Sequence, residues 1–476
     1  MLGLHVIDNV ILILYFIGMV ILGVWTARRI KSMGEFFMPR RFGKWMMAMH
    51  GFGTGTHSDQ AVSVAAKTFT NGLSGIWYQW LWLFCTPFYW MIAPMMRRFR
   101  AITTADVFKA RYDRSVAMLY ACVGVIQLMV SIGVMLKGAG AIIASCFGNA
   151  VSPNIIIVIM TILFLIYGSA GGLAAAILTD FVQGLLTVVF SFLLLPFILQ
   201  AVGGIEALRQ AISDPQMFAL FATQEISVFY VVVISINALI GIVTQPHTMG
   251  NCAAGRTEMD GRFGFTAGTF LKRVCTVAWC FTGLIAVAYF VGKDVEPDQV
   301  YGLMARDFLP RILPGMLGIF LAALLASVMS SCDSFMIASS ALFTENIYRP
   351  IIRNRSEQHY ILVGRITAFV IVIGGTLFAF RLPSVVKGLE FFWKISSMMG
   401  IAFWLGFFWR RATRAGAWAA TLAGFVMWWL TTQPFFISVL GQLPCADRLR
   451  LVVENGSAPA IYLPWQMILY LSVGIM

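Results

Sequence analysis

Long apolar segments follow one another along almost the entire chain, and short polar connections separate them. A helix needs about 20 apolar residues to cross a bilayer, so each segment predicts a membrane-spanning helix. We predict about thirteen spans, near residues 8–26, 45–66, 75–96, 116–146, 154–170, 176–201, 227–249, 270–292, 315–343, 360–381, 386–409, 415–434 and 461–476. The chain is therefore expected to be an all-α, polytopic membrane protein.

Composition and charge support this interpretation. Of the 476 residues 59% are hydrophobic and 12% charged, and the mean hydropathy is +0.82. The formal charge of +13 does not indicate a nucleic-acid partner, because 23 of the 34 Lys and Arg residues fall in inward connections when the N-terminus is outside. This bias is the positive-inside rule. We expect a multi-pass protein of the cell (inner or plasma) membrane, with the lipid bilayer as its surroundings.

The second predicted span is unusual because glycines and polar residues occupy its middle. Gly51, Gly53 and Gly55 precede the run His57-Ser58-Asp59-Gln60. Glycine weakens a helix, and an unwound backbone at membrane depth is tolerated only where it is buried or lines a cavity. Carbonyls released by such a break are ready cation ligands. The alternative is a flexible kink that holds satisfied polar side chains, with the histidines in structural roles.

The seventh span is interrupted in a similar way. Asn237 lies within it, and Thr244-Gln245-Pro246-His247 breaks its helical hydrogen bonding. Spans 2–6 and 7–11 thus form two groups of five, each beginning with a broken helix, which is typical of transporters that bind substrate between two repeats. The predicted units are a first span with its connection (1–43), the first repeat (44–201), an outer loop with a short surface helix (202–226), the second repeat (227–409) and C-terminal spans (410–476).

The ninth span carries a stripe of hydroxyl groups. Ser327, Ser330, Ser331 and Ser334 share one helical face, and Asp333 adds a carboxylate. Hard cations take oxygen ligands, so this face could hold one. The alternative is that small residues let helices pack closely. Eight cysteines with no paired spacing predict neither a disulfide framework nor a transition-metal site, so Na⁺ is the only metal expected.

Several other polar residues lie within spans and are expected to line a substrate cavity. They are Asp59, Gln127, Lys137 and Lys394. A membrane lysine usually faces the bundle interior or a water-filled cavity, so free lysines would favour a carboxylate-bearing solute. The alternative is that the lysines pair with the acids Asp59, Asp180 and Asp333. Asp180 follows a predicted glycine turn near Tyr167–Leu173, and a solvated acid at a helix end is an alternative to an ion ligand.

Three motifs together resemble the sodium:solute symporter family, whose members include sodium-coupled glucose, proline, pantothenate and sialic-acid transporters. The motifs are Tyr167…Gly171-Gly172-Leu173…Thr179-Asp180…Gln183, Met329-Ser330-Ser331…Asp333-Ser334 before Phe343-Thr344-Glu345-Asn346-Ile347-Tyr348, and Gly406-Phe407-Phe408-Trp409-Arg410-Arg411 before Gly416-Ala417. The resemblance covers nearly the whole chain. It implies an inverted five-plus-five helix bundle of the leucine-transporter type.

The resemblance also implies two ion sites. The main sodium would be held by the carbonyls of His57, Gln60 and Ser327 and the hydroxyls of Ser330 and Ser331. A second sodium, present in some relatives, would lie nearer the cytoplasm among Asp180, Ser330 and Ser334, with Asp333 standing where such relatives have a serine.

Substrate-lining positions of the sugar-transporting relatives would map onto Gln79, Asn237, Gln245 and Lys272. However, Gln79 stands where those relatives carry an acid, and Gly250 stands where they usually carry an arginine. A sugar substrate is therefore not supported.

The leading hypothesis is secondary active symport, in which sodium moving down its gradient drives a small organic solute into the cell by alternating access. We expect a transporter and not an enzyme. A proton-coupled symporter using Asp59 or Asp180, or a membrane-embedded solute sensor, is the alternative. From Leu463 to Met476 the last span has only 14 residues, fewer than the ~20 that a span needs, so we expect the chain to continue.

Overall fold

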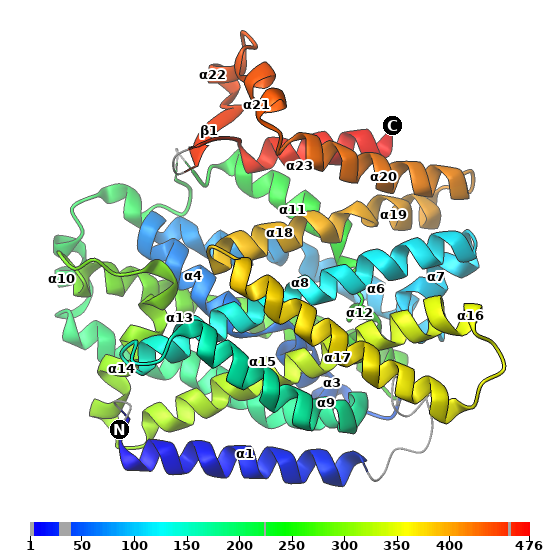
Figure 1. Ribbon diagram of the computed structural model, residues 1–476. Coiled ribbons are helices and arrows are strands. Elements are labelled where there is room, and N and C mark those ends of the chain that lie inside the picture. Colours follow the sequence, from blue (N-terminus) through cyan, green and yellow to red (C-terminus); the bar gives the residue numbers. More distant parts are fainter. Residues whose placement is uncertain (1–3, 28–39, 223–224, 456–457) are drawn as a thin grey trace.

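The computed structural model describes residues 4–27, 40–222, 225–455 and 458–476. These residues are mostly helical (Figure 1), so the predicted fold class is confirmed. The elements are α1 (Val6–Ala27), α3 (Lys44–Gly55), α4 (Ser58–Asn71), η1 (Gly72–Ile76), α5 (Trp77–Trp80), η2 (Leu81–Cys85), α6 (Thr86–Arg98), α7 (Thr104–Arg111), α8 (Arg114–Cys146), α9 (Pro153–Ala201), α10 (Gly204–Ala211), η3 (Pro215–Phe218), α11 (Val228–Ile242), α12 (Thr248–Ala253), α13 (Glu258–Tyr289), η4 (Pro297–Gln299), α14 (Val300–Ile312), α15 (Met316–Ala341), the π-helix η5 (Leu342–Tyr348), α16 (Arg349–Ile351), α17 (Glu357–Arg381), α18 (Val385–Met398), α19 (Gly400–Phe408), α20 (Arg414–Leu430), α21 (Pro434–Gly441), α22 (Ala446–Leu449), β1 (Val452–Asn455), β2 (Ala458–Ile461) and α23 (Leu463–Ile475).

Both predicted helix breaks are present. Helix α3 ends at Gly55 and α4 begins at Ser58, and the two residues between them have extended backbone. Helix α11 ends at Ile242 and α12 begins at Thr248, with Pro246 in the gap. Proline lacks an N–H and clashes with the preceding turn of a helix. Glycine has a low helix propensity, so a run of glycines can leave the helix at a small cost in free energy. The two groups of spans therefore begin as the sequence indicates.

The predicted turn between spans five and six is not present as a break. The backbone is helical throughout α9, a run of 49 residues that includes the expected turn near 167–173. At about 1.5 Å per residue this run is far longer than one bilayer crossing, so α9 supplies the length of both spans. The side chains at 166–176, including most of the first family motif, lie outside the described part of the structure.

The long helices run roughly along one common direction in Figure 1. Helices α10 and α14 lie at one end of the bundle, and α7 and α16 lie at the other. Because α7 and α16 adjoin connections rich in arginine, such as Arg97-Arg98 and Arg353, the second end is the predicted inner side. The hairpin of β1 and β2 pairs Val452 with Ile461 and stands apart from the bundle together with α21 and α22.

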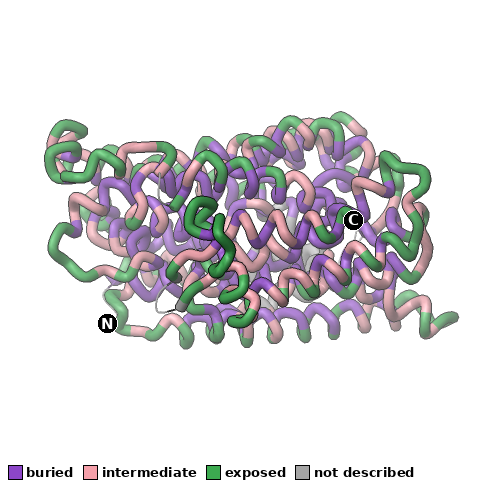
Figure 2. Tube along the Cα trace, turned by 90° about the horizontal axis from the view of Figure 1, so that it is seen from above, coloured by how far each residue is buried: buried purple, intermediate pink, exposed green. Residues whose placement is uncertain are grey.

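Buried residues fill the centre of the bundle and exposed residues follow its outline (Figure 2). The outward faces of α1, α9 and α17 expose large apolar side chains, among them Leu14, Ile159 and Leu377. In water such continuous apolar faces would be unfavourable, whereas lipid tails are apolar themselves. The surface therefore fits a bilayer.

Length and apolarity identify six helices in the described residues that can each cross a membrane, or seven if the bent pair α20–α21 is one span. Four shorter apolar segments, Val6–Gly18, Pro153–Leu163, Val228–Ile242 and Leu463–Ile475, add to these. The third predicted span is divided among α5, η2 and α6, and α18 and α19 form the eleventh. The predicted count of thirteen stays a prediction.

Helices α3 and α13 pack closely along a seam of glycines. A Cβ atom added at Gly268 would lie 2.3 Å from the carbonyl oxygen of Ala48, and one at Gly264 would lie 2.4 Å from Cβ of Met47. Only glycine fits at such distances, and small residues are what allow helix backbones to approach in membranes. The seam holds the next turns of α13, including Lys272 and Arg273, against the broken helix.

Candidate functional site

The break between α3 and α4 places backbone carbonyls inside the bundle. Thr56 and His57 are extended, with φ values of −126° and −131°. The carbonyl of Gly55, released from the helix, accepts hydrogen bonds from Gln60 Nε2 at 2.7 Å and from Lys272 Nζ. Because Thr56 is buried and Gly55 and His57 are half-buried, these carbonyls find partners within the protein.

The serine face of α15 meets this break. Ser327 Oγ donates to the carbonyl of Thr56 at 2.7 Å, and Ser331 Oγ donates to the carbonyl of Gly53 at 3.0 Å. The side chain of Ser330 lies outside the described part of the structure. Two of the predicted hydroxyl groups are therefore in direct contact with the broken helix, which is more than helix packing requires.

The oxygen atoms around the break fit a hard monovalent cation. The carbonyl of His57 accepts a hydrogen bond from Gln60 N, and the carbonyl of Gln60, inside α4, accepts one from Ser63 Oγ. Three buried side-chain oxygens have no hydrogen-bond partner among the described residues, namely Thr56 Oγ1, Asp59 Oδ2 and Gln60 Oε1. Oxygen-only donors match the ligand preference of hard cations. Among the described residues no three His, Cys, Asp or Glu side chains form a transition-metal cluster.

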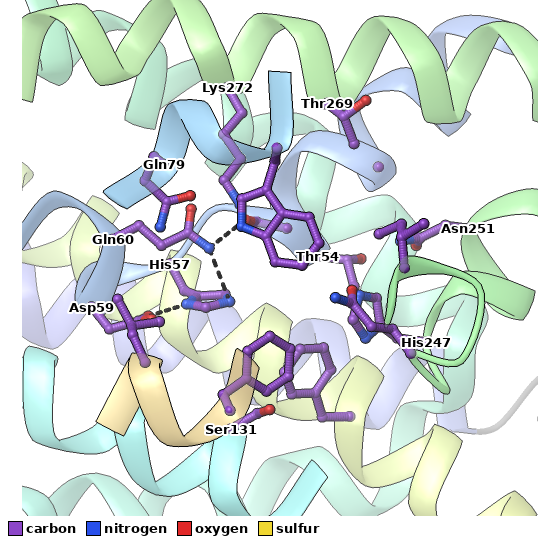
Figure 3. A pocket seen from close by; sticks show the side chains of 18 of the residues that line it. Thr54, His57, Asp59, Gln60, Gln79, Ser131, His247, Asn251, Thr269 and Lys272 are labelled. Carbon is purple, nitrogen blue, oxygen red and sulfur yellow. Dashed lines mark hydrogen bonds and ion pairs between the residues drawn. The ribbon is translucent and has the colours of Figure 1, made fainter. Parts of the chain in front are cut away.

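A cavity of about 80 Å³ lies beside the break (Figure 3). Polar side chains from both broken helices and from α13 line it, together with aromatic rings. Of the predicted substrate-lining residues it contains Asp59, Gln79, Gln245 and Lys272. It holds a few polar groups within an apolar wall, which is the usual character of a small-molecule site.

Charged and polar groups on one side of the cavity form a connected network. Figure 3 shows the His57 ring between Gln60 and Asp59. His57 Nδ1 contacts Asp59 Oδ1, and Gln60 Nε2 lies 3.4 Å from His57 Nε2. Lys272 completes the group through the carbonyl of Gly55. Asp59 of α4 and Lys272 of α13 thus both have protein partners at the break.

The second broken helix forms another part of the wall. Gln245 and His247, from the segment between α11 and α12, both line the cavity. The His247 ring stacks on Phe335 of α15 with 4.8 Å between ring centres. His247, Thr54 and Asn251 also line a second cavity of about 30 Å³ that reaches Thr103 and Leu342. These three side chains stand between the two cavities.

Two predicted lining residues lie elsewhere. Asn237 does not line the cavity: its Nδ2 donates to the carbonyl of Trp393 at 3.1 Å, and its Oδ1 accepts from Tyr470 Oη at 2.6 Å. It links α11 to α18 and α23. Gln127 is buried one turn from Ser131, and the residues of α8 that line the cavity are Ser131 and Val134.

The two intramembrane lysines are also placed away from the cavity. The charge of Lys137 acts on Asp298, a carboxylate in the connection before α14 that accepts a hydrogen bond from Val385 N at 2.9 Å. Burial raises the pKa of Asp298, while the Val385 N–H and the Lys137 charge oppose that shift. Lys394 interacts with the charge of Glu390, one turn before it. Both lysines have carboxylate neighbours, although not the acids that the sequence suggested.

The predicted second ion site contains two buried oxygens without a hydrogen-bond partner among the described residues, Asp180 Oδ1 and Ser334 Oγ, and it stays a prediction. Asp180 is fully buried, so it is not a solvated acid at a helix end. Its Oδ2 lies 2.6 Å from His50 Nδ1. Ser334 lines the 30 Å³ cavity together with His50, whereas the charge of Asp333 acts on Tyr15 of α1. The structure thus gives Asp180 a histidine partner, and Asp333 is not among the residues that line this cavity.

The sequence did not single out several residues that line the cavity. Arg273 was counted among the inward-facing charges because the span was predicted to begin near 270, but α13 begins at Glu258 and Arg273 is 4% exposed. A capping box between Thr257 and Asp260 is the sequence signal for this earlier start. The aromatic side chains of Trp82, Tyr89, Phe265, Phe335, Phe392 and Trp393 were likewise not identified.

Comparison with known proteins agrees with the motifs. The profile of the sodium:solute symporter family matches residues 36–424. The osmoregulated proline transporter OpuE of Bacillus subtilis is 26% identical over 88% of each chain, and the sodium/pantothenate symporter of Escherichia coli is 24% identical over 75% of this chain and 74% of its own.

The fold is similar to the substrate-bound, outward-open structure of a Na⁺-coupled sialic acid symporter, with a TM-score of 0.79, 18% identity and coverage of 99% and 96% of the two chains. This likeness supports the inverted-repeat fold expected from the two matched helix breaks. Because the family profile covers most of the chain, the protein belongs to the sodium:solute symporter family, whose members carry small organic solutes across the membrane with sodium.

Proposed function

We propose that the cavity between the two broken helices holds the solute and that the α3–α4 break holds the coupling sodium. The carbonyls of His57, Gln60 and Ser327 and the hydroxyls of Ser330 and Ser331 are the proposed ligands. The single observation that carries this proposal is the contact of Ser327 and Ser331 with the carbonyls of Thr56 and Gly53. These bonds bring the serine face of α15 within reach of the break.

Sodium binding and solute binding are coupled in this arrangement through shared residues. Asp59 and Gln60 of α4 line the cavity, and the backbone carbonyls of His57 and Gln60 are proposed ligands of the ion. An ion that fixes the start of α4 also fixes these side chains, so the solute meets a site that is already ordered. Binding that removes an ordering cost for a second ligand gives positive cooperativity.

Alternating access requires a route from the cavity to each side. The second cavity leads from Thr54, His247 and Asn251 toward Thr103 at the start of α7, on the predicted inner side. We place the inner barrier at these three side chains. Their displacement would join the two cavities and release the solute into the cell.

Relatives guide the range of solutes to be tested. Proline and pantothenate, named for the two relatives, both carry a carboxylate, and proline carries an ammonium group as well. The purified chain should be reconstituted in vesicles and screened for uptake of labelled solutes with an inward sodium gradient, with equal sodium on both sides, and with potassium in its place. Uptake above equilibrium only under the gradient is the expected result. Equal uptake under all three conditions would contradict the proposal.

Proton coupling is the second candidate because two histidine–carboxylate pairs lie along the same path. His57 contacts Asp59 at the cavity, and His50 contacts Asp180 nearer the inner side. In the same vesicles a pH-sensitive dye distinguishes the two ions. Solute uptake that an inward sodium gradient drives against an opposing proton gradient, with alkaline pH outside, would exclude protons as the coupling ion. Acidification of the lumen that depends on solute would favour protons.

A further inference from the structure

Arg273 is a buried cation that faces the cavity without a complete set of partners. The residue is 4% exposed and lines the cavity from α13. Its Nε and Nη1 have no hydrogen-bond partner among the described residues. Its own carbonyl accepts a hydrogen bond from Trp80 Nε1 at 3.0 Å, which fixes the backbone at this point. The guanidinium is therefore held in place while part of its donor set is unused.

No carboxylate in the described part of the chain balances this charge. The groups that act on Arg273 electrostatically are the Tyr89 hydroxyl, which also hydrogen-bonds to it, the Cys85 thiol and the like-charged Lys272. Arg98 and Arg349, in contrast, contact the carboxylates of Glu258 and Glu345. An unpaired buried charge is strongly unfavourable unless something supplies the missing interactions. The cavity is where such a partner can enter.

The remaining charged groups of the cavity already have protein partners. Lys272 donates to the Gly55 carbonyl, and Asp59 contacts His57. With neutral histidines, the formal charges of Lys272, Arg273 and Asp59 leave one positive charge in the cavity. One monovalent anion neutralises it, and a carboxylate offers the planar pair of oxygens that matches a guanidinium fork.

We propose that Arg273 binds the carboxylate of the transported solute, and that the solute is a small monocarboxylate with an apolar body. The proposal rests on the cavity being the solute site. Val134, Phe265, Leu389 and Trp393 supply the apolar wall for the rest of the molecule. Selectivity for an acid therefore comes from α13, and not from Lys137 or Lys394, which the sequence suggested for this task.

Matched pairs of ligands test the proposal directly. The full chain, purified in detergent with sodium, is titrated with benzoate and benzamide, butyrate and butyramide, and cyclohexanecarboxylate and its amide, and dose-dependent shifts in Tm give apparent Kd values. The acids should bind at least about tenfold more tightly than their amides, as expected for one charge-assisted hydrogen bond of about 1.5 kcal/mol. In Arg273→Gln this preference should fall to about onefold. Arg273→Lys should keep part of it, because the charge is retained.

Sodium titration without solute separates this proposal from the function on which it rests. Arg273→Gln should keep the wild-type Tm shift with sodium, which also shows that the variant folds. Arg262→Gln, on the same helix but paired with Glu258, is the matched control and should keep the acid preference. If amides bind as well as acids, if no acid binds, or if Arg273→Gln keeps the preference, the proposal is wrong while sodium coupling stands. Loss of sodium dependence in the wild type would instead overturn the proposed function.

Discussion

His50 Nδ1 lies 2.6 Å from Asp180 Oδ2, and solvent reaches 1% or less of either side chain. The pair joins α3, one turn before the helix break, to α9, and Thr54 Oγ1 lies 3.1 Å from the same His50 nitrogen. A buried carboxylate in contact with an imidazole already has a partner that can share its charge or its proton. Asp180 Oδ2 therefore has a protein partner that can take the place of a second sodium, whereas the buried Oδ1 has no hydrogen-bond partner among the described residues.

We accordingly expect one sodium per solute, with or without the Asp180 carboxylate. Asp180→Asn should lower the free energy of unfolding, by up to about 3 kcal/mol, because it weakens a buried contact between a carboxylate and an imidazole. It should leave the ratio of sodium to solute unchanged. Thermal unfolding gives the first quantity, and paired flux measurements of labelled sodium and solute give the second. If the wild type transports two sodium ions per solute and Asp180→Asn transports one, Asp180 contributes to a second sodium site and this expectation is wrong.

At the main sodium site we expect substitutions to change the sodium dependence of uptake. Ser331→Ala removes a hydroxyl that contacts the Gly53 carbonyl, so the ion loses a ligand. The sodium concentration for half-maximal uptake should rise about tenfold, corresponding to about 1.4 kcal/mol, and the double change of Ser330 and Ser331 to alanine should raise it further.

Ser340→Ala is the control for the serine variants. This hydroxyl is equally buried on α15, but it donates to the Ile337 carbonyl within its own helix at 3.0 Å. Its removal should leave the sodium dependence at the wild-type value. Equal sodium dependence in Ser331→Ala and Ser340→Ala would show that the serine face serves packing alone.

The sequence was sufficient to locate both helix breaks and the serine face. Glycines and a proline in the middle of apolar spans have a direct structural consequence, because each removes helix stability where no water can replace the lost hydrogen bonds. The i, i+3, i+4, i+7 spacing of the serines likewise fixes one face regardless of tertiary structure. Local chemistry alone determines such features.

The positions of the charged side chains could not be predicted in the same way. Hydropathy placed the start of one span near 270, whereas α13 begins at Glu258, so Arg273 moves from the membrane surface into the core. Lys137 and Lys394 were expected in the cavity, but their neighbours are Asp298 and Glu390. Which helix a long side chain faces depends on how helices rotate and pack, and spacing within one helix does not contain that information.

Variants of the two lysines test their revised placement. Lys137→Gln removes a charge near buried Asp298 and should lower Tm, yet it should change the KM of an anionic solute by less than about threefold, the range of changes outside a binding site. The same limit is expected for Lys394→Gln. Initial uptake rates over a range of solute concentrations provide the KM values. If the KM of the anionic solute rises tenfold or more in either variant, that lysine lines the solute cavity after all.

The close approach of α3 and α9 gives a last prediction. A Cβ atom added at Gly53 would lie 2.8 Å from Asp180 Oδ1 and 2.9 Å from its Cγ. The Asp180 side chain is held by His50 and cannot move aside freely. Gly53→Ala should therefore force α3 and α9 apart, at a cost of about 1–3 kcal/mol in the free energy of unfolding, and disturb the carbonyl that Ser331 contacts.

Two measurements separate this steric effect from the helix preference of alanine. In Gly53→Ala both Tm and the apparent affinity for sodium should fall, because one displacement affects the His50–Asp180 pair and the Gly53 carbonyl together. Gly43→Ala is the control: a Cβ there meets nothing within 4 Å, just before α3 begins, so both quantities should stay near wild type. Combining Gly53→Ala with Asp180→Ala removes the clashing carboxylate and should recover part of the lost sodium affinity. If sodium affinity is unaffected in Gly53→Ala although Tm falls, the break is not positioned by this contact.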